Sequence, residues 1–225
     1  MWEEFDYETD ITTEKLIEKI NELNEDEKIH GILVQLPLPK KVYTPDVMRA
    51  INPKKDVDGF TAYNLGKMFL SAKFEDLAPC TPMGVIKMLE YYKIPVEGKE
   101  VVIVGHSNLV GKPLSVMLMN RNATVTTCHI FTKDLAYHTK RADIICVAVG
   151  KQNLITSDMV KDGAVIIDVG VNKTKEGKLV GDVDFAEVSK KVSYITPVPG
   201  GAGPMTVACL MENTVKAAKR LNNLK

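Results

Sequence analysis

The sequence predicts an α/β protein built mainly on a doubly wound parallel sheet, and three observations support this. Val101–Val104 is a run of four apolar residues, typical of a strand buried on both faces. The run ends at Gly105, and Gly111 and Pro113 then open a segment with helical spacing, which is a strand, a turn and a helix in succession. Short apolar runs continue to alternate with helical or turn segments as far as residue 196.

This alternation assigns the second half of the chain to one sheet with its crossover segments. The apolar runs predict strands at 101–104, 124–128, 144–149, 164–169 and 193–196. Shorter helical or turn segments are expected between them, near 113–120, 133–140, 156–160 and 184–191. Parallel strands joined in this way place all their carboxyl ends, and with them the ligand contacts, at one edge of the sheet.

The first half predicts a smaller α/β domain. Thr12 or Thr13 caps an amphipathic helix, and Ile29–Leu36 has the composition of a strand. Threonine followed by proline in the first turn predicts two helices, from Thr44 to Ile51 and from Thr81 to Tyr92. A loop of mixed character is expected between them, around Asn64 and Gly66. The helical period of Thr206–Leu221 predicts a terminal helix that packs back across this domain. The expected division is 1–92 with 205–222, and 93–204.

Composition excludes several classes of protein. The 225 residues carry 29 basic and 29 acidic side chains and are 45% hydrophobic, which is ordinary for a globular protein and favours no nucleic-acid or membrane partner. No apolar run approaches the ~20 residues of a membrane span. The four cysteines have no metal or disulfide spacing, so reduced thiols and a cytoplasmic location are expected.

A few residue patterns suggest ligand contacts, each with a purely structural alternative. The glycine turn at 105–111 can hold a phosphate, although its spacing is not the G-x-G-x-x-G fingerprint. Gln35 ends a predicted strand, and one carboxylate of the pair Asp56 and Asp58 can accept two parallel N–H donors, or the pair can simply make a turn. The segment TPVPGGAGPMT at 196–206 has glycines that let the backbone approach a flat ring closely.

Seven segments in this order resemble one known family, the methylenetetrahydrofolate dehydrogenase/cyclohydrolases. They are VQLPLP, KDVDGF, NLG, PCTPMG, VGHSNLVGKP, VGDVDF and TPVPGGAGPMT. The resemblance runs from about residue 12 to the C-terminus. It implies a Rossmann-like cofactor domain, a folate site between two α/β domains, and a homodimer. The implied reaction is oxidation of 5,10-methylene- to 5,10-methenyltetrahydrofolate with NADP or NAD, followed by hydrolysis to the 10-formyl derivative in one-carbon metabolism.

The resemblance also assigns roles to individual residues. The resemblance implies that Asp58 binds the pterin ring, because a carboxylate can accept hydrogen bonds from two adjacent N–H donors of the ring. It also implies that Gln35 positions the family's catalytic lysine. The loop lining the cleft near the folate matches Pro199, Gly200 and Gly201. The cofactor contacts match Gly105, His106, Ser107, Val110, Gly111, His129, Ile130, Gly150, Gly170 and Thr206. Asp168 either joins the cofactor contacts or is a turn residue.

The sequence departs from the family pattern at its start. The family has an N-terminal helix with Tyr-x-x-x-Lys that bears the central acid/base lysine. Here Tyr7 is followed by no lysine until Lys15, and nothing in the spacing supports Lys40, Lys54 or Lys55 as a substitute. Without the lysine we expect hydrolysis to lose a factor of roughly 10²–10⁴, while hydride transfer, which needs alignment of two rings, persists. The alternative is a catalytically weakened folate- or nucleotide-binding fragment or pseudoenzyme.

The second departure concerns the choice of cofactor. Members that use NADP carry Arg after the first glycine and Ser after the Cys-His pair, where this chain has His106 and Ile130. Neither replacement matches a guanidinium or hydroxyl as a phosphate partner. However, no carboxylate follows the second strand to repel a 2′-phosphate. The expectation is NAD or dual use rather than strict NADP, with no metal.

Overall fold

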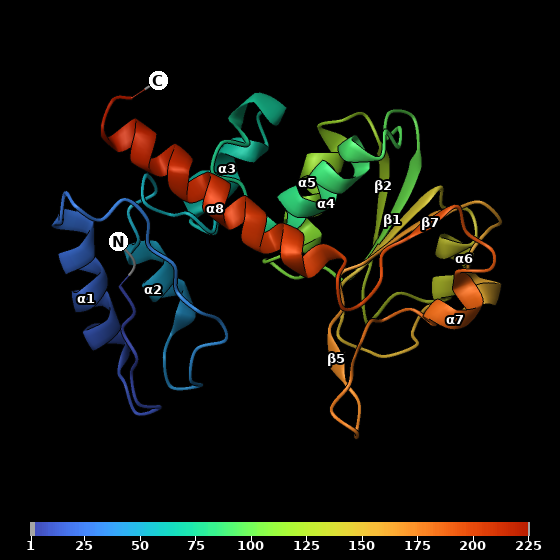
Figure 1. The fold of residues 1–225 in the computed structure, drawn as a ribbon, viewed down its shortest axis with the longest axis horizontal. Coiled ribbons are helices and arrows are strands. Elements are labelled where there is room, and N and C mark those ends of the chain that lie inside the picture. Colours follow the sequence, from blue (N-terminus) through green and yellow to red (C-terminus); the bar gives the residue numbers. More distant parts are fainter. Residues whose placement is uncertain (1–2, 225) are drawn as a thin grey trace.

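The computed structural model describes residues 3–224, and its centre is a five-stranded parallel sheet in the order β2-β1-β3-β4-β7 (Figure 1). Every neighbouring pair runs parallel, so the carboxyl ends of all five strands lie at one edge. The bounds are β1 Glu100–Val104, β2 Thr124–Cys128, β3 Ile144–Val147, β4 Val165–Asp168 and β7 Tyr194–Ile195. These confirm all five predicted strands, some with shorter ends.

Side chains of the sheet alternate between two separate hydrophobic cores, as expected for strands covered on both faces. One core contains Val101 and Ile103 and is closed by helices α4 (Cys80–Tyr91) and α5 (Gly111–Met119). The other contains Val102 and Val104 and lies against the segments of α6 (Leu135–Thr139), η2 (Ser157–Met159) and α7 (Phe185–Val188). The predicted doubly wound architecture is therefore confirmed.

The N-terminal part contains α1 (Thr13–Glu25), α2 (Thr44–Ala50), α3 (Ala62–Met68) and η1 (Ala72–Phe74). Thr12 caps α1 through a hydrogen bond from the Lys15 N–H, one of the two caps that the sequence allowed. The prediction of a strand over 29–36 is wrong in form, since only Ile32 forms a bridge, to Asp56, and no ladder develops. The predicted loop around Asn64 is also wrong: α3 begins there because the Thr61 hydroxyl caps it.

Two long helices connect the two parts of the molecule. Helix α8 (Ala202–Leu221) runs from the sheet to the N-terminal helices, as expected for a terminal helix that packs back across the first domain (Figure 1). It begins four residues before the predicted start, because Pro204 lies in its first turn, where proline is tolerated. Helix α4 packs along α8 at Gly84, where a Cβ would lie 3.0 Å from the Met205 Cβ.

The sequence reading missed a small hairpin, β5 (Asn172–Lys173) with β6 (Leu179–Val180), which projects beyond the main sheet (Figure 1). Each strand has only two residues, too short for a period of two to be visible. Across residues 3–224, no helix has both the length and the apolar content that crossing a bilayer would require.

Candidate functional site

The first aspartate of the Asp-Val-Asp turn has a structural role. Asp56 is buried, and its Oδ1 accepts hydrogen bonds from the Gly59 and Phe60 N–H groups at 2.8 and 3.2 Å. Its Oδ2 accepts from the Thr61 N–H at 2.8 Å and from the Asn64 side chain at 2.9 Å. All of these contacts are internal to the protein. Asp56 therefore fixes the turn, and both of its oxygens are occupied by protein donors.

The second aspartate, Asp58, has few protein partners and a perturbed acidity. Burial raises its pKa to about 6, the neighbouring Cys80 side chain lowers the pKa, and the nearby Asp56 charge raises it. Burial also raises the pKa of Cys80, so that its thiol stays protonated and donates to the Val57 carbonyl at 3.4 Å. A partly buried carboxylate without a cationic partner is typical of a ligand-binding position, because donors from a ligand can supply the missing stabilisation.

The N-terminus of α4 connects Asp58 to the proline- and glycine-rich loop. Cys80 starts the helix, and the hydroxyl of Thr81 lies 3.0 Å from that of Thr206 on α8. The loop itself is tightly folded, since a Cβ on Gly201 would lie 2.5 Å from the Pro197 carbonyl oxygen. The structure thus joins two predicted ligand-binding segments through one helix end, although they are far apart in sequence.

The glycine turn after β1 requires both of its glycines. Gly105 has a φ of +116°, and a Cβ there would lie 2.5 Å from the Ala148 carbonyl oxygen. A Cβ on Gly111 would lie 2.0 Å from the Gly105 carbonyl oxygen. The start of α5 therefore packs directly against the end of β1, and this close contact is possible only with glycine at both positions. The turn between them lies at the carboxyl edge of the sheet. The Ser107 hydroxyl accepts the Val110 N–H at 3.1 Å and stabilises this turn.

The same turn has the features of a phosphate cradle. Within residues 3–224, the backbone N–H groups of 106–109 donate to no protein acceptor, and these residues are exposed at the N-terminus of α5. Free N–H groups at a helix start suit an anion. Beside them the rings of His106 and His129 lie 4.8 Å apart, while Ile130 is 88% exposed. The residues present therefore fit a dinucleotide.

Two buried aspartates hold the neighbouring loops at the carboxyl edge. Asp182 accepts hydrogen bonds from the N–H groups of residues 149, 150 and 151 and from the Asn172 side chain, at 2.7–3.1 Å. Asp168 accepts from the N–H groups of residues 170, 182 and 183. A Cβ on Gly170 would lie 2.1 Å from the Asp182 Cγ. Asp168 is thus a turn residue, the second of its two predicted roles, and Asp182 links Gly150 to Gly170.

Gln35 is exposed, and its amide donates only to the Leu36 carbonyl, at 3.2 Å. Of the substitute lysines, Lys55 is committed elsewhere: its buried ammonium donates to the carbonyls of Leu23, Asn24 and Asp26 and caps the C-terminal end of α1. Lys55 is therefore not available as an acid/base group. Among residues 3–224, no group of three or more His, Cys, Asp or Glu side chains could hold a metal ion.

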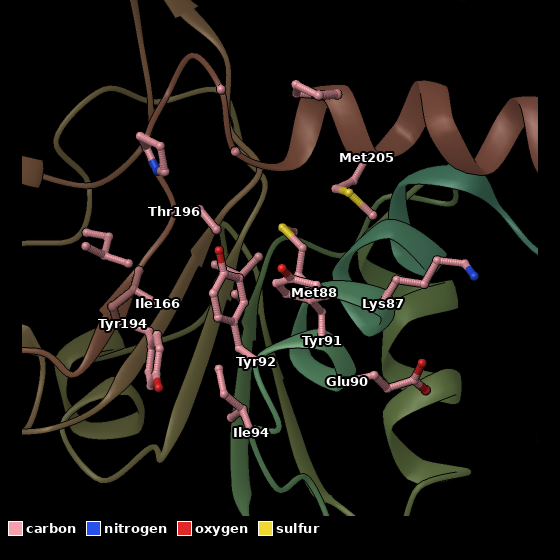
Figure 2. A pocket seen from close by; sticks show the side chains of 16 residues that line it. Lys87, Met88, Glu90, Tyr91, Tyr92, Ile94, Ile166, Tyr194, Thr196 and Met205 are labelled. Atoms are coloured by element: carbon pink, nitrogen blue, oxygen red, sulfur yellow. The ribbon is translucent and has the colours of Figure 1, made fainter.

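A cleft of about 840 Å³ lies beside the predicted site (Figure 2). It is bounded by α4, by β7 and by the start of α8, and it includes Gly200, Gly201 and other residues of the predicted segment 196–206. Figure 2 shows the rings of Tyr91, Tyr92 and Tyr194 gathered in it. Its two labelled charged side chains, Lys87 and Glu90, pair with Glu212 at 2.9 Å and with Arg121 at 3.7 Å. Asp58 and the cradle at 106–109 lie outside this cleft.

Sequence reasoning missed the roles of Asp182 and Asn213. Asp182 lies in VGDVDF, a motif that contributed to the resemblance without any role for its aspartate. Asn213 is a buried polar residue on the inner face of α8, and its side chain reaches the turn before Asp58. The available signal was one polar residue at a core position of an amphipathic helix.

The fold and the glycine turn define a dinucleotide-binding α/β protein. Residues 79–222 match the family model "Tetrahydrofolate dehydrogenase/cyclohydrolase, NAD(P)-binding domain", and residues 2–58 match that family's catalytic domain. The chain therefore belongs to the tetrahydrofolate dehydrogenase/cyclohydrolase family.

Individual relatives agree with this assignment. The bifunctional protein FolD of Nautilia profundicola is 58% identical over 209 residues, which cover 93% of this chain and 73% of that protein. The crystal structure of the Campylobacter jejuni bifunctional enzyme FolD is 55% identical, with a TM-score of 0.91, and covers 94% of this chain and 75% of that one. A Trypanosoma brucei methylenetetrahydrofolate dehydrogenase-cyclohydrolase solved with NADP cofactor and inhibitor is 37% identical, with a TM-score of 0.90 and coverages of 94% and 74%.

Proposed function

We propose that this protein oxidises 5,10-methylenetetrahydrofolate to the 5,10-methenyl form with a nicotinamide cofactor and hydrolyses the product to 10-formyltetrahydrofolate. Membership of the family supports both activities. The observation that carries the proposal is the combination of a cradle of free N–H groups at the end of β1 with the cation-free carboxylate of Asp58.

In the proposed mechanism Asp58 orients the folate. Its carboxylate accepts two parallel N–H donors of the pterin, which places the one-carbon bridge next to the cofactor ring. The N–H groups at 106–109 hold the cofactor phosphates, and Asp182 fixes the loops at 149–151 and around Gly170. The nicotinamide, when bound, accepts the hydride. Gln35 and the loop at Pro199, Gly200 and Gly201 complete the folate contacts.

A steady-state assay tests both activities. We expect methenyl formation, followed by absorbance, to depend on both methylenetetrahydrofolate and a nicotinamide cofactor, and the methenyl signal then to decay faster than in buffer. The absence of cofactor-dependent methenyl formation from folded protein would reject the dehydrogenase. An unaccelerated decay would reject only the hydrolase.

Cofactor choice depends, in this proposal, on the two histidines beside the turn. A guanidinium binds phosphate oxygens bidentately, as an imidazole cannot. His106→Arg is therefore expected to raise kcat/KM for NADP relative to NAD by about tenfold, with KM for folate unchanged. The control is His138→Arg, on α6. If the ratio of kcat/KM for NADP to that for NAD is unchanged in the His106 variant, this position does not contact the 2′-phosphate.

We also propose the division into 1–92 with 205–222 and 93–204, and a cytoplasmic location. The position of α8, which starts at the sheet and ends among the N-terminal helices, supports the division (Figure 1). The four free, buried cysteines support a compartment in which thiols stay reduced.

Finally, we propose that two copies of the chain form a homodimer. Strand β7 is an open edge of the sheet, and the exposed rings of Tyr92 and Tyr194, 5.8 Å apart, adjoin it in the apolar cleft (Figure 2). A two-fold axis would bury this face against its own copy. Tyr194→Lys is expected to raise the dimer dissociation constant at least tenfold by light scattering, while Tyr43→Lys, at the start of α2, leaves it unchanged. A wild-type monomer at micromolar concentration would contradict the proposal.

A further inference from the structure

The inner face of α8 is apolar except at its centre. Leu210 and Ala217 on this face pack against Val57 and Leu77. Asn213 lies between them and is only 4% exposed. A buried amide at a core position weakens packing unless its hydrogen bonds are made, so its partners indicate what it does there.

Those partners are two backbone carbonyls that belong to different segments of the N-terminal part. The Nδ2 group of Asn213 donates to the Val57 oxygen at 2.9 Å and to the Ala78 oxygen at 3.0 Å. Because carbonyls only accept, the orientation of the amide is determined. The side chain thus connects residues that are 156 and 135 positions away in the sequence.

The two carbonyls belong to segments that adjoin Asp58 in the fold. Val57 directly precedes Asp58, and Ala78 contacts the turn that follows it, since a Cβ on Gly59 would lie 2.5 Å from the Ala78 carbonyl carbon. The Cys80 thiol, which donates to the same Val57 carbonyl at 3.4 Å, lies 3.6 Å from the Asn213 nitrogen. One amide therefore contacts the residue before Asp58, the segment against the turn that follows it, and the Cys80 thiol.

We propose that Asn213 is a positioning residue for substrate binding. Its amide binds the Val57 and Ala78 carbonyls together, fixes the position of the segment that carries Asp58, and so orients the Asp58 carboxylate toward the folate. The inference rests on the proposed role of Asp58. It makes the terminal helix part of the substrate site, although Asn213 itself does not touch the folate.

Asn213→Ala removes both hydrogen bonds and leaves the cofactor turn intact. We expect the KM for methylenetetrahydrofolate to rise about ten- to a hundredfold, as misplacement by a fraction of an ångström allows, while the KM for NADP stays within about twofold. Two controls lie on the same helix. Thr214→Ala removes only a bond within α8, to the Leu210 carbonyl. Leu210→Ala removes packing against Val57 and Leu77 but keeps both hydrogen bonds of Asn213.

A merely structural role gives a different pattern. If Leu210→Ala lowers the melting temperature as much as Asn213→Ala and raises the folate KM equally, the positioning role is overturned. Asn213→Ser keeps one donor and is expected to recover part of the affinity; it also replaces the alanine variant if that does not fold. A serine variant no better than alanine in its folate KM would contradict the proposal.

A double-mutant cycle with Asp58→Asn separates this inference from the proposed function. If Asn213 acts through Asp58, Asn213→Ala adds less than about twofold to the folate dissociation constant in the Asp58→Asn background. An additive effect would overturn the inference alone. If Asp58→Asn itself leaves folate binding unchanged, the proposed role of Asp58 fails, whatever Asn213 does.

Discussion

Replacing Asp58 with asparagine is expected to weaken folate binding while making the unliganded protein more stable. The amide cannot accept two parallel N–H donors as a carboxylate does, and unpaired donors of the ligand are costly. The expected loss is about 2–4 kcal/mol of binding free energy, or roughly 30- to 1000-fold in the dissociation constant. Titration calorimetry with a folate substrate analogue measures it, with Asp56 left intact because it holds the turn.

The gain in stability follows from the raised pKa of Asp58. Burial holds this pKa at about 6, above the ordinary value of 3.8, so the folded protein binds the proton more tightly than the unfolded chain does. The stability due to this group is present below about pH 4 and is lost as the pH rises through 6. At pH 8 Asp58→Asn is thus expected to add about 1–3 kcal/mol to the free energy of unfolding.

The pH dependence provides the control for both effects. Near pH 4 the wild-type carboxyl is protonated in the folded protein, so the stability difference between wild type and variant shrinks. Folate affinity of the wild type is expected to fall by about tenfold per pH unit below 6, while the variant shows no such slope. Equal unfolding free energies of wild type and variant at pH 8, or parallel pH profiles for folate, would contradict this account.

Replacing Asp182 with alanine is expected to give the largest loss of stability. The side chain is fully buried and accepts four hydrogen bonds, three of them from backbone N–H groups of residues 149–151. Its removal leaves these partly buried donors without their protein partner and a cavity between the loops that follow β3 and β4. We expect a cost of about 3–5 kcal/mol in chemical denaturation.

Replacement of Asp182 is also expected to lower the affinity for the cofactor more than the affinity for folate. The released loops lie at the carboxyl edge of the sheet, beside the glycine turn, whereas Asp58 lies in the other part of the molecule. Asp162→Ala is a matched control, since that side chain is 89% exposed. A variant with wild-type stability, or one that loses folate and cofactor affinity equally, would contradict the assigned role.

Local patterns in the sequence predicted the sheet well, because its strands are short runs of β-branched residues that must be buried on both faces. Val101–Val104 and Ile144–Val147 are examples. The same rule failed at Ile29–Leu36, where apolar composition is present but only one bridge forms. It failed again around Asn64, whose weak helix propensity is overridden by the Thr61 cap and by burial of Met68.

Within the candidate site, residue types predicted the ligand positions but not the residues that support them. Nothing local distinguishes Asp56 from Asp58; the difference is that Asp56 meets Asn64 and three backbone N–H groups. Asp182 and Asn213 act across 31 or more positions of sequence on backbone groups. Backbone acceptors and donors have no signature in the sequence, so such contacts appear only in the folded structure.

The most direct test of the central claim follows the hydride itself. Methylenetetrahydrofolate deuterated on its one-carbon bridge is incubated with the protein and an oxidised nicotinamide cofactor, and both products are analysed by mass spectrometry. The account predicts one deuterium in the reduced cofactor and one in the methenyl product, with far slower transfer in the Asp58→Asn variant. Reduced cofactor without deuterium, or the absence of reduction by folded protein that binds both ligands, would contradict it.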